Sequence, residues 1–149
     1  MTVRSYPFVI EPSEKGLAAL CVDHLILVTA TTKVELEQKM TEALALHLYE
    51  REQEGKSIKA SKEVKVDLND YEARAQLVYV EPAKLNPISL ELEQLIQNSG
   101  LTRTEVAERI GTSASGLKRL TDPFHHGHKL ETLERVAQAL DKKLELSFT

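Results

Sequence analysis

The chain has 149 residues, 42% of them hydrophobic, which is enough to build one ordinary domain or two small ones with real cores. We expect no membrane span and no export, because no apolar run reaches the roughly 20 residues of a transmembrane helix and the first residues, MTVRSYPFVIEP, lack a signal-peptide pattern. The 19 basic and 23 acidic side chains argue against a binder that relies on generic attraction to phosphates, whereas the lone Cys21 excludes an internal disulfide and fits a soluble, cytoplasmic protein.

Residues 6–30 alternate short β-rich runs with polar breaks: YPFVIEP, GLAALCV and LILVTATT. Valine, isoleucine, leucine and threonine dominate these runs, and residues 12–16 have the composition of a turn, so the segment predicts a small antiparallel meander. Cys21 is then expected to be a small core residue in a strand.

From Lys33 the hydrophobic pattern changes to steps of four residues, with Glu, Lys and Gln between them. This pattern predicts an amphipathic helix that begins near Thr32 and ends before Gly55. Packing onto the strands explains its apolar stripe better than a cofactor does. The stripe consists of Leu36, Met40, Leu44 and Leu48.

Residues 55–70 are polar and charged, and we expect a loop or a weakly ordered edge strand there. Residues 73–82, ARAQLVYVEP, predict a further strand. The order of strands, one helix and a last strand indicates an α+β unit whose sheet is covered on one face. The segment PAKLNP, between Pro82 and Pro87, then marks a boundary between a domain of residues 1–84 and one of residues 85–149.

After Pro87 the pattern is helical. Ser89 can cap a first helix that ends at Gly100, and Thr102 with Glu105 predicts a capping box at the start of the next helix. The first helix carries its apolar residues at Leu92, Leu95 and Ile96.

Residues 101–120, LTRTEVAERIGTSASGLKRL, have the spacing of two short helices joined by a tight turn. Gly111 suits a left-handed backbone at the corner, and Thr112 and Ser113 can cap the second helix, which Asp122 and Pro123 end. This is the pattern of a helix-turn-helix, whose second helix lies in a DNA major groove. The inward positions are Val106, Ala107, Ile110, Leu117 and Leu120.

A fourth helix follows the loop FHHGHK, and the tail LELSF, residues 144–148, alternates as a short strand would. An exposed edge of this kind invites pairing with a second copy of the chain. The inward residues of the fourth helix are expected to be Leu130, Leu133, Val136, Ala137 and Leu140.

The outward residues of the second motif helix are the candidate DNA contacts. Arg119 can read guanine through paired donors to O6 and N7, and Lys118 can reach a base or a phosphate. The neighbouring serines can bond to phosphate or base, Ala114 can touch only an apolar group, and Arg103 suits a backbone phosphate. The predicted DNA-binding residues are Arg103, Thr112, Ser113, Ala114, Ser115, Lys118, Arg119, His126 and Lys129.

Metal binding and catalysis receive little support. His125, His126 and His128 are close in sequence, but a tetrahedral site needs a fourth ligand and none is nearby, so phosphate contact or a surface loop is the better interpretation. His24 and His47 stand alone in the sequence, and no GxSxG, HExxH, CxxC or phosphate-binding glycine loop is present. We expect a protein that is not an enzyme and uses no cofactor or metal. The acidic residues of the long helix, Glu35, Glu37, Glu50, Glu52 and Glu54, are best explained as a solvated face.

The C-terminal half resembles the Xre/Cro-type helix-turn-helix group, and the succession LTRTEVAERIG, LKRL, HH and ETLERVAQALDKKLELSF is similar to HicB antitoxins that end in such a domain. The N-terminal half, with its YPFVIEP strand, hairpin, long helix and further strand, resembles the partial ribonuclease-H-like HicB fold. The resemblance implies a type II antitoxin. Its N-terminal domain would bind a HicA-type toxin, a ribonuclease that cleaves mRNA, and its C-terminal domain would form a homodimer or tetramer and repress its own operon.

In such a dimer, two recognition helices roughly 34 Å apart would read operator half-sites one helical turn apart. Two other interpretations stay open. The chain can be a stand-alone transcription regulator whose N-terminal domain senses a ligand or builds a dimer. It can also be an enzyme targeted by the helix-turn-helix, although Glu11 and Asp23 are the only acidic candidates on its strands.

Overall fold

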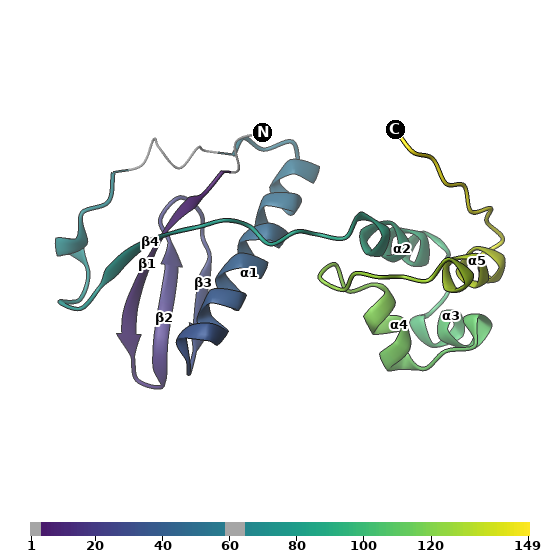
Figure 1. Cartoon of the computed structure of the whole chain (residues 1–149), viewed down its shortest axis with the longest axis horizontal. Helices are drawn as coiled ribbons and strands as arrows, with labels where there is room; N and C mark the ends of the chain where they lie inside the picture. The colour runs from purple at the N-terminus through teal and green to yellow at the C-terminus, as the bar shows by residue number, and fades with distance from the viewer. Residues whose placement is uncertain (1–3, 59–64) are drawn as a thin grey trace. The chain divides into compact units, whose positions relative to one another are not determined.

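Figure 1 shows the computed structural model of the chain, which describes residues 4–58 and 65–149. The protein is an α+β protein, and its described residues form one four-stranded sheet. It divides into two compact units, Met1–Lys84 and Leu85–Thr149, at the position where the sequence predicts a domain boundary. Among the described residues, no helix combines the length and the apolar composition that crossing a bilayer requires.

The N-terminal unit is built on an antiparallel sheet with the strand order β3-β2-β1-β4. The strands are β1 (Tyr6–Ser13), β2 (Gly16–Cys21), β3 (Leu27–Ala30) and β4 (Gln76–Val80). The first three form the predicted meander, in which Ser13 pairs with Gly16 at the first hairpin. Gly16 has φ of +143°, and a Cβ there would overlap the carbonyl oxygen of Ala30, so this hairpin requires glycine.

The long helix α1 (Lys33–Gln53) covers one face of this sheet, as predicted. The Thr32 hydroxyl accepts a hydrogen bond from the Glu35 amide and caps the helix, and the next turn carries a Lys39–Glu35 ion pair at 3.0 Å. Cys21 is buried in the shared core, as predicted, and burial raises the pKa of its thiol. The buried core consists of Tyr6, Phe8, Ala19, Cys21, Ile26, Ala30, Leu36, Met40, Leu44 and Val80.

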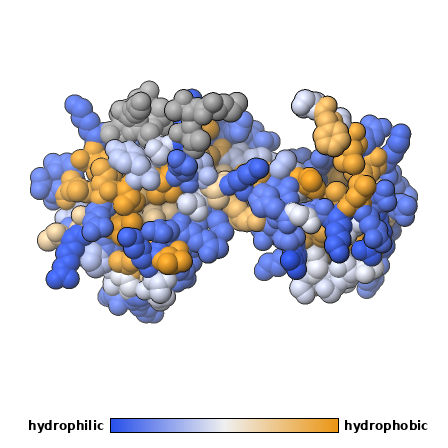
Figure 2. Space-filling model, viewed as in Figure 1, coloured by the Kyte–Doolittle hydropathy of each residue, from blue (hydrophilic) through white to orange (hydrophobic). Residues whose placement is uncertain are grey.

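The opposite face of the sheet carries an apolar row that crosses all four strands. Leu27 pairs with Leu20, Leu20 with Val9, and Val9 with Leu77. These residues alternate with the ones that pack against α1, so they lie on the other face. Leu27, at the β3 edge, is 67% exposed. Figure 2 shows hydrophobic side chains gathered over the strands of this unit.

The connection between α1 and β4 is a loop in its described part, which is one of the two predicted alternatives, and it contains one short helical turn. Part of the predicted segment, residues 59–64, lies outside the described residues. In the described part there is no strand, and Leu68–Asp70 form a short 3₁₀ helix, η2, because the Asp67 carboxylate accepts from the Asn69 amide. The strand predicted over residues 73–82 is shorter, Gln76–Val80, and begins after a turn in which the Ala75 amide bonds the Glu72 carbonyl.

The C-terminal unit contains four helices around one core. They are α2 (Pro87–Asn98), α3 (Arg103–Ile110), α4 (Ala114–Leu120) and α5 (Leu130–Ala139). All four were predicted from the sequence. The core consists of Leu92, Ile96, Val106, Ala107, Ile110, Leu117, Leu133 and Val136.

Three local predictions for this unit were wrong. Asn86, rather than Ser89, caps α2, because its side chain accepts from the Ile88 amide and Pro87 already occupies the first helical turn. Leu130 is half exposed, since it is the first residue of α5. The tail, residues 142–149, belongs to no strand, because a strand needs a backbone partner and this chain supplies none in its described residues.

Candidate nucleic-acid interface

Helix α3 begins with the predicted capping box. The Thr102 hydroxyl accepts from the Glu105 amide at 3.2 Å, and the Thr102 amide donates to the Glu105 carboxylate at 2.7 Å. These bonds satisfy amides that no helical carbonyl can reach. Hydrogen bonds from the Thr102 amide and hydroxyl also lower the pKa of Glu105. The start of α3 is therefore fixed by the two residues that the sequence pattern named.

A glycine turn ends α3 and sets the direction of α4. Gly111 adopts the left-handed conformation, with φ of 77°. Its amide donates to the Glu108 carbonyl at 3.1 Å, and the Thr112 amide donates to the Ala107 carbonyl at 2.9 Å. This pair of bonds is a Schellman motif, which closes a helix and redirects the chain. The break predicted at Gly111 is confirmed.

Helix α4 is held to the core by its buried face and is capped at its start. Leu117 is buried in the core, and Leu120 packs against it partly buried. The Ser113 hydroxyl accepts from the Gly116 amide at 3.0 Å, whereas Thr112, which was also a predicted cap, makes no capping bond. The Thr112 side chain instead lies against Gly116, where a Cβ would overlap its hydroxyl. Glycine at position 116 thus lets the turn fold against the first turn of α4.

The outer face of α4 is open to solvent and carries two cations. Lys118 and Arg119 enter no ion pair within residues 4–58 and 65–149, and α4 itself contains no acidic residue. The predicted contacts Ser113, Ala114, Ser115, Lys118 and Arg119 are all exposed. A small-residue turn followed by two unpaired cations can approach a phosphate backbone and a base edge closely.

Arg103 is held differently from the other predicted DNA contacts. Its Nη1 atom lies 2.8 Å from the Glu93 carboxylate on α2, and its Nη2 donates to the Thr121 hydroxyl at 2.9 Å. Thr121 in turn bonds the Leu117 carbonyl at the end of α4. Arg103 therefore ties α3 to α2 and α4, and its guanidinium is already engaged within the chain. The sequence prediction of a phosphate contact did not foresee this role.

The histidine loop divides into an inward and an outward part. His128 points inward: its Nε2 atom lies 2.7 Å from the Leu120 carbonyl oxygen and 3.2 Å from the Ser89 hydroxyl. Its Nδ1 atom lies 3.3 Å from the Asn86 amide nitrogen. With the proton on Nε2, the ring donates to Leu120 and accepts from Asn86. His126 and Lys129, the predicted contacts, are exposed at the outer side of the loop.

His125 and Arg119 interact electrostatically across this surface. Partial burial lowers the pKa of His125, and the nearby Arg119 and His128 lower it further. The imidazole of His125 therefore takes up a proton less readily than that of an unperturbed histidine.

The two histidines of the N-terminal unit, which the sequence left isolated, lie together. His47 Nε2 on α1 is 3.2 Å from His24 Nδ1, and the Tyr6 ring lies beside His24. No spacing rule could connect two residues 23 positions apart. Across the described part of the chain, no three His, Cys, Asp or Glu side chains are grouped so that they could hold a metal ion.

No protein-family model matches the chain, and no curated protein is significantly similar to it. The function proposed below therefore rests on the geometry of the two units and on the motif residues.

Proposed function

We propose that the C-terminal unit binds double-stranded operator DNA with α4 in the major groove and that the chain represses its own operon. The observation that carries the proposal is the outer face of α4. That face is exposed, free of acidic residues and rich in small side chains, and it carries Lys118 and Arg119 without internal ion partners among the described residues. Leu117 fixes the helix to the core from the opposite side.

In this proposal the residues of the α4 face have different tasks. Arg119 reads a guanine through bidentate bonds to O6 and N7, whereas Lys118 binds a phosphate or a base edge. Ser113 and Ser115 offer hydroxyl groups to the backbone or bases, and Ala114 contacts an apolar group such as a thymine methyl. Lys129, His126 and Thr112 flank the helix where phosphates would pass. Arg103 acts mainly by orienting α3 against α4.

The proposal includes a homodimer. The C-terminal unit has 8 basic and 9 acidic side chains, so its overall charge gives it no generic attraction to DNA. Two copies double the local cations that α4 presents, and a two-fold pair of α4 helices fits a palindromic operator. The dimer is therefore a physical requirement of useful affinity in this interpretation.

We further propose that the chain is a HicB-type antitoxin whose N-terminal unit covers a HicA-type mRNA-cleaving toxin. The support is the resemblance of the strand and helix order and the apolar row on the sheet face opposite α1, which ends at the exposed Leu27. The unit also carries 14 acidic and 11 basic side chains, a balance that suits a basic, RNA-binding partner.

The DNA proposal is tested by fluorescence anisotropy with duplexes from the region upstream of the chain's own gene. Arg119→Ala should weaken specific binding by about 1–3 kcal/mol and relax specificity at one base pair. Arg135→Ala removes the same charge from the exposed side of α5 and is the matched control. Equal affinities for the two variants would refute the assignment of Arg119 to base reading.

The antitoxin proposal is tested by expressing the chain with the small reading frame adjacent to its gene. The neighbouring product should stop growth alone, co-purify with the full chain and lose binding to Leu27→Asp. Val34→Asp places the same change at another exposed apolar residue, on α1, and should bind normally. Absence of a toxic neighbour would favour the stand-alone regulator, and metal-dependent nuclease turnover would favour the enzyme.

A further inference from the structure

The two edges of the sheet in the N-terminal unit differ in how the chain protects them. At the β3 edge, the Lys39 ammonium on α1 donates to the Thr29 carbonyl oxygen at 2.9 Å, so a charged side chain occupies this edge. The β4 edge carries no charged residue and no proline between Gln76 and Val80, and no strand of the described residues pairs with its outer side (Figure 1). Natural sheets protect exposed edges with lysine, proline or a covering element, because unpaired backbone groups bind other strands. The β4 edge is therefore open to an additional strand.

The hydrogen bonds of β1 show which backbone groups of β4 face outward. The Pro7 carbonyl accepts from the Val22 amide at 3.0 Å, so the backbone of Pro7 points toward the β2 side. Because backbone groups alternate in direction along a strand, Phe8 bonds in the other direction, to its β4 partner Val78. The residues on either side of Val78 then point their N–H and C=O groups away from β1, at the free edge. These two residues are Leu77 and Tyr79.

A groove of about 370 Å³ lies between β4 and α1. One end is closed, because the Ala83 amide donates to the Thr41 carbonyl at 2.9 Å and the chain after β4 thereby crosses to α1. The volume falls within the range of ligand pockets, so the groove can take side chains of a strand that adds to β4. The apolar side chains that line it are Ile10, Met40, Val78 and Val80.

Charged side chains lie at both ends of the groove. The bond to Thr41 places the end of β4 beside that residue, so Glu81 lies at the closed end. Lys33 lies about two helical turns before Thr41 and lines the open end, and Glu37 is exposed on the rim between them. None of these three charges enters an ion pair within residues 4–58 and 65–149. A ligand that places a cation near Glu81 and a carboxylate near Lys33 would complement both ends.

We propose that the β4 edge binds an extended peptide segment of another protein as an additional antiparallel strand. The antiparallel direction is the more stable pairing, and it makes the peptide run from Glu81 toward Lys33. Peptide residues opposite Val80 and Val78 point to the same face as these valines and enter the groove. Main-chain hydrogen bonds form at the two outward-facing residues of β4. The peptide pattern is therefore a cation, an aliphatic residue, any residue, a second aliphatic residue, any residue and a carboxylate.

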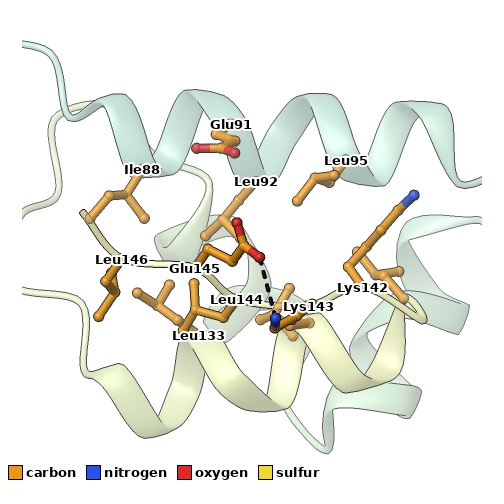
Figure 3. Close-up of a pocket in the computed structure, with 13 residues that line it drawn as sticks. Ile88, Glu91, Leu92, Leu95, Leu133, Lys142, Lys143, Leu144, Glu145 and Leu146 are labelled. Carbon is orange, nitrogen blue, oxygen red and sulfur yellow. Dashed lines mark ion pairs between the residues drawn. The ribbon is translucent and has the colours of Figure 1, made fainter.

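The α1–β4 groove differs from the other apolar surfaces of the chain. It lies on the α1 face of the sheet, whereas the apolar row proposed for the toxin lies on the opposite face, so the inference does not rest on the antitoxin proposal. Figure 3 shows the apolar groove of the C-terminal unit, which has a similar volume and is lined by α2, α5 and the tail. Leu144 and Leu146 of the tail already lie along that groove, and no strand borders it in the described part of the chain. It offers a peptide an apolar surface without a strand edge and is the internal comparison in a binding experiment.

The first experiment is an NMR titration of the isotope-labelled full chain with the peptide acetyl-Lys-Val-Thr-Val-Thr-Glu-amide, up to about 2 mM because so small an interface binds weakly. The amide signals of Leu77 and Tyr79 should shift, and those of the α2–α5 groove should not. N-methylation of the second threonine, opposite Leu77, removes a main-chain donor and should weaken binding at least about fivefold. N-methylation of the second valine, opposite Val78, modifies a group that points away from β4 and should leave the dissociation constant within about twofold.

The second experiment changes the edge of β4 itself. Tyr79→Pro removes an outward N–H group and leaves the bonds to β1 in place, so it should abolish peptide binding while the far-UV circular dichroism stays unchanged. Tyr79→Ala keeps this N–H group and is the matched control, which should bind within about threefold of the wild type.

The third experiment tests the direction of the peptide. Lys33→Glu should weaken binding about threefold, because exposed ion pairs contribute little, and a peptide that ends in lysine instead of glutamate should restore it. Glu81→Lys should be compensated only by a peptide that begins with glutamate. Compensation at the opposite ends would overturn the antiparallel arrangement.

The other occupants of the edge are also outcomes of these tests. A wild-type dimer that Tyr79→Pro dissociates in sedimentation velocity would make a second copy the occupant and would overturn the proposal. Loss of the co-purified neighbouring product from Tyr79→Pro would make the toxin the occupant. Equal affinities of the two N-methylated peptides would exclude strand pairing. An absence of shifts, or shifts at the α2–α5 groove alone, would remove the β4 edge as the site.

Discussion

His128→Ala should destabilise the C-terminal unit by about 2–4 kcal/mol, because this ring joins the end of α4 to the start of α2. The bond from Nε2 to the Leu120 carbonyl, at 2.7 Å, contributes about 0.5–1.5 kcal/mol. Ser89 has 0% exposure and loses its hydroxyl partner, and a buried polar group without a partner costs about 1–3 kcal/mol. Asn86 keeps its bond to the His125 carbonyl and adds little to the loss.

The chain offers a convenient way to locate this effect. Its tyrosines, Tyr6, Tyr49, Tyr71 and Tyr79, all lie in the N-terminal unit, and the chain has no tryptophan. Tyrosine fluorescence in a urea titration therefore follows the N-terminal unit, whereas far-UV circular dichroism follows the helices of both units. His128→Ala should lower the midpoint of the helical transition, with a fall in Tm of roughly 10–20 °C, and leave the tyrosine transition in place.

The matched control is His126→Ala, which removes an exposed imidazole two residues away and should change stability by less than about 0.5 kcal/mol. If the two variants had equal stability, the contacts of His128 would contribute no more to stability than those of an exposed side chain. That result would refute the interpretation of its three contacts. A shift of the tyrosine transition by His128→Ala would instead refute the assignment of the effect to the C-terminal unit.

Three further predictions follow from single residues: two concern backbone conformation and one concerns a titrating group. Gly16→Ala should destabilise the N-terminal unit by about 2–3 kcal/mol or more, seen as an earlier tyrosine transition, because φ of +143° and the Ala30 carbonyl both exclude a Cβ; a wild-type midpoint would contradict this. Asp141→Gly should stabilise the C-terminal unit by roughly 0.5–1 kcal/mol, since Asp141 ends α5 with φ of 52°; a lower Tm would show that the conformation is unstrained. In the folded chain the pKa of Glu105 lies below its ordinary value of 4.5. The contribution of its carboxylate to the free energy of unfolding is therefore complete above pH 4.5 and is lost as the pH falls through the lowered pKa. Glu105→Gln should therefore weaken the fall in the unfolding free energy of the C-terminal unit at acid pH. An unchanged pH dependence would mean that protonation of Glu105 does not weaken the capping box.

Features set by neighbouring residues could be predicted from the sequence. The capping box depends on two residues three positions apart, the break at Gly111 depends on one residue's lack of a Cβ, and the position of α1 depends on an apolar step of four. The wrong cap of α2 shows the limit of this reasoning. Asn86 and Ser89 are both good capping residues, and the choice between them depends on Pro87 and on a buried contact with His128.

Features set by tertiary contacts could not be predicted. His128 meets Asn86 and Ser89 across 42 and 39 positions, and Arg103 meets Glu93 and Thr121 on two other helices. No local pattern distinguishes an inward histidine from the outward ones beside it in FHHGHK. The exposure of the α4 face was predictable because it is the complement of its buried face, and the assignment of DNA contacts to that face stays a prediction.

The charge balance of the C-terminal unit links the proposed DNA contact to the proposed homodimer. With 8 basic and 9 acidic side chains, the unit can bind DNA only through cations at α4 and the loop after it. Lys118, Arg119 and Lys129 supply three such cations per copy and six per dimer. The logarithm of the association constant should then fall against the logarithm of salt concentration with a slope of about −5 if a dimer binds the duplex and about −3 if a single copy binds it. A wild-type slope near about −3 would mean that one copy binds each duplex and would refute the dimer, because a second copy cannot bind without adding its own phosphate contacts.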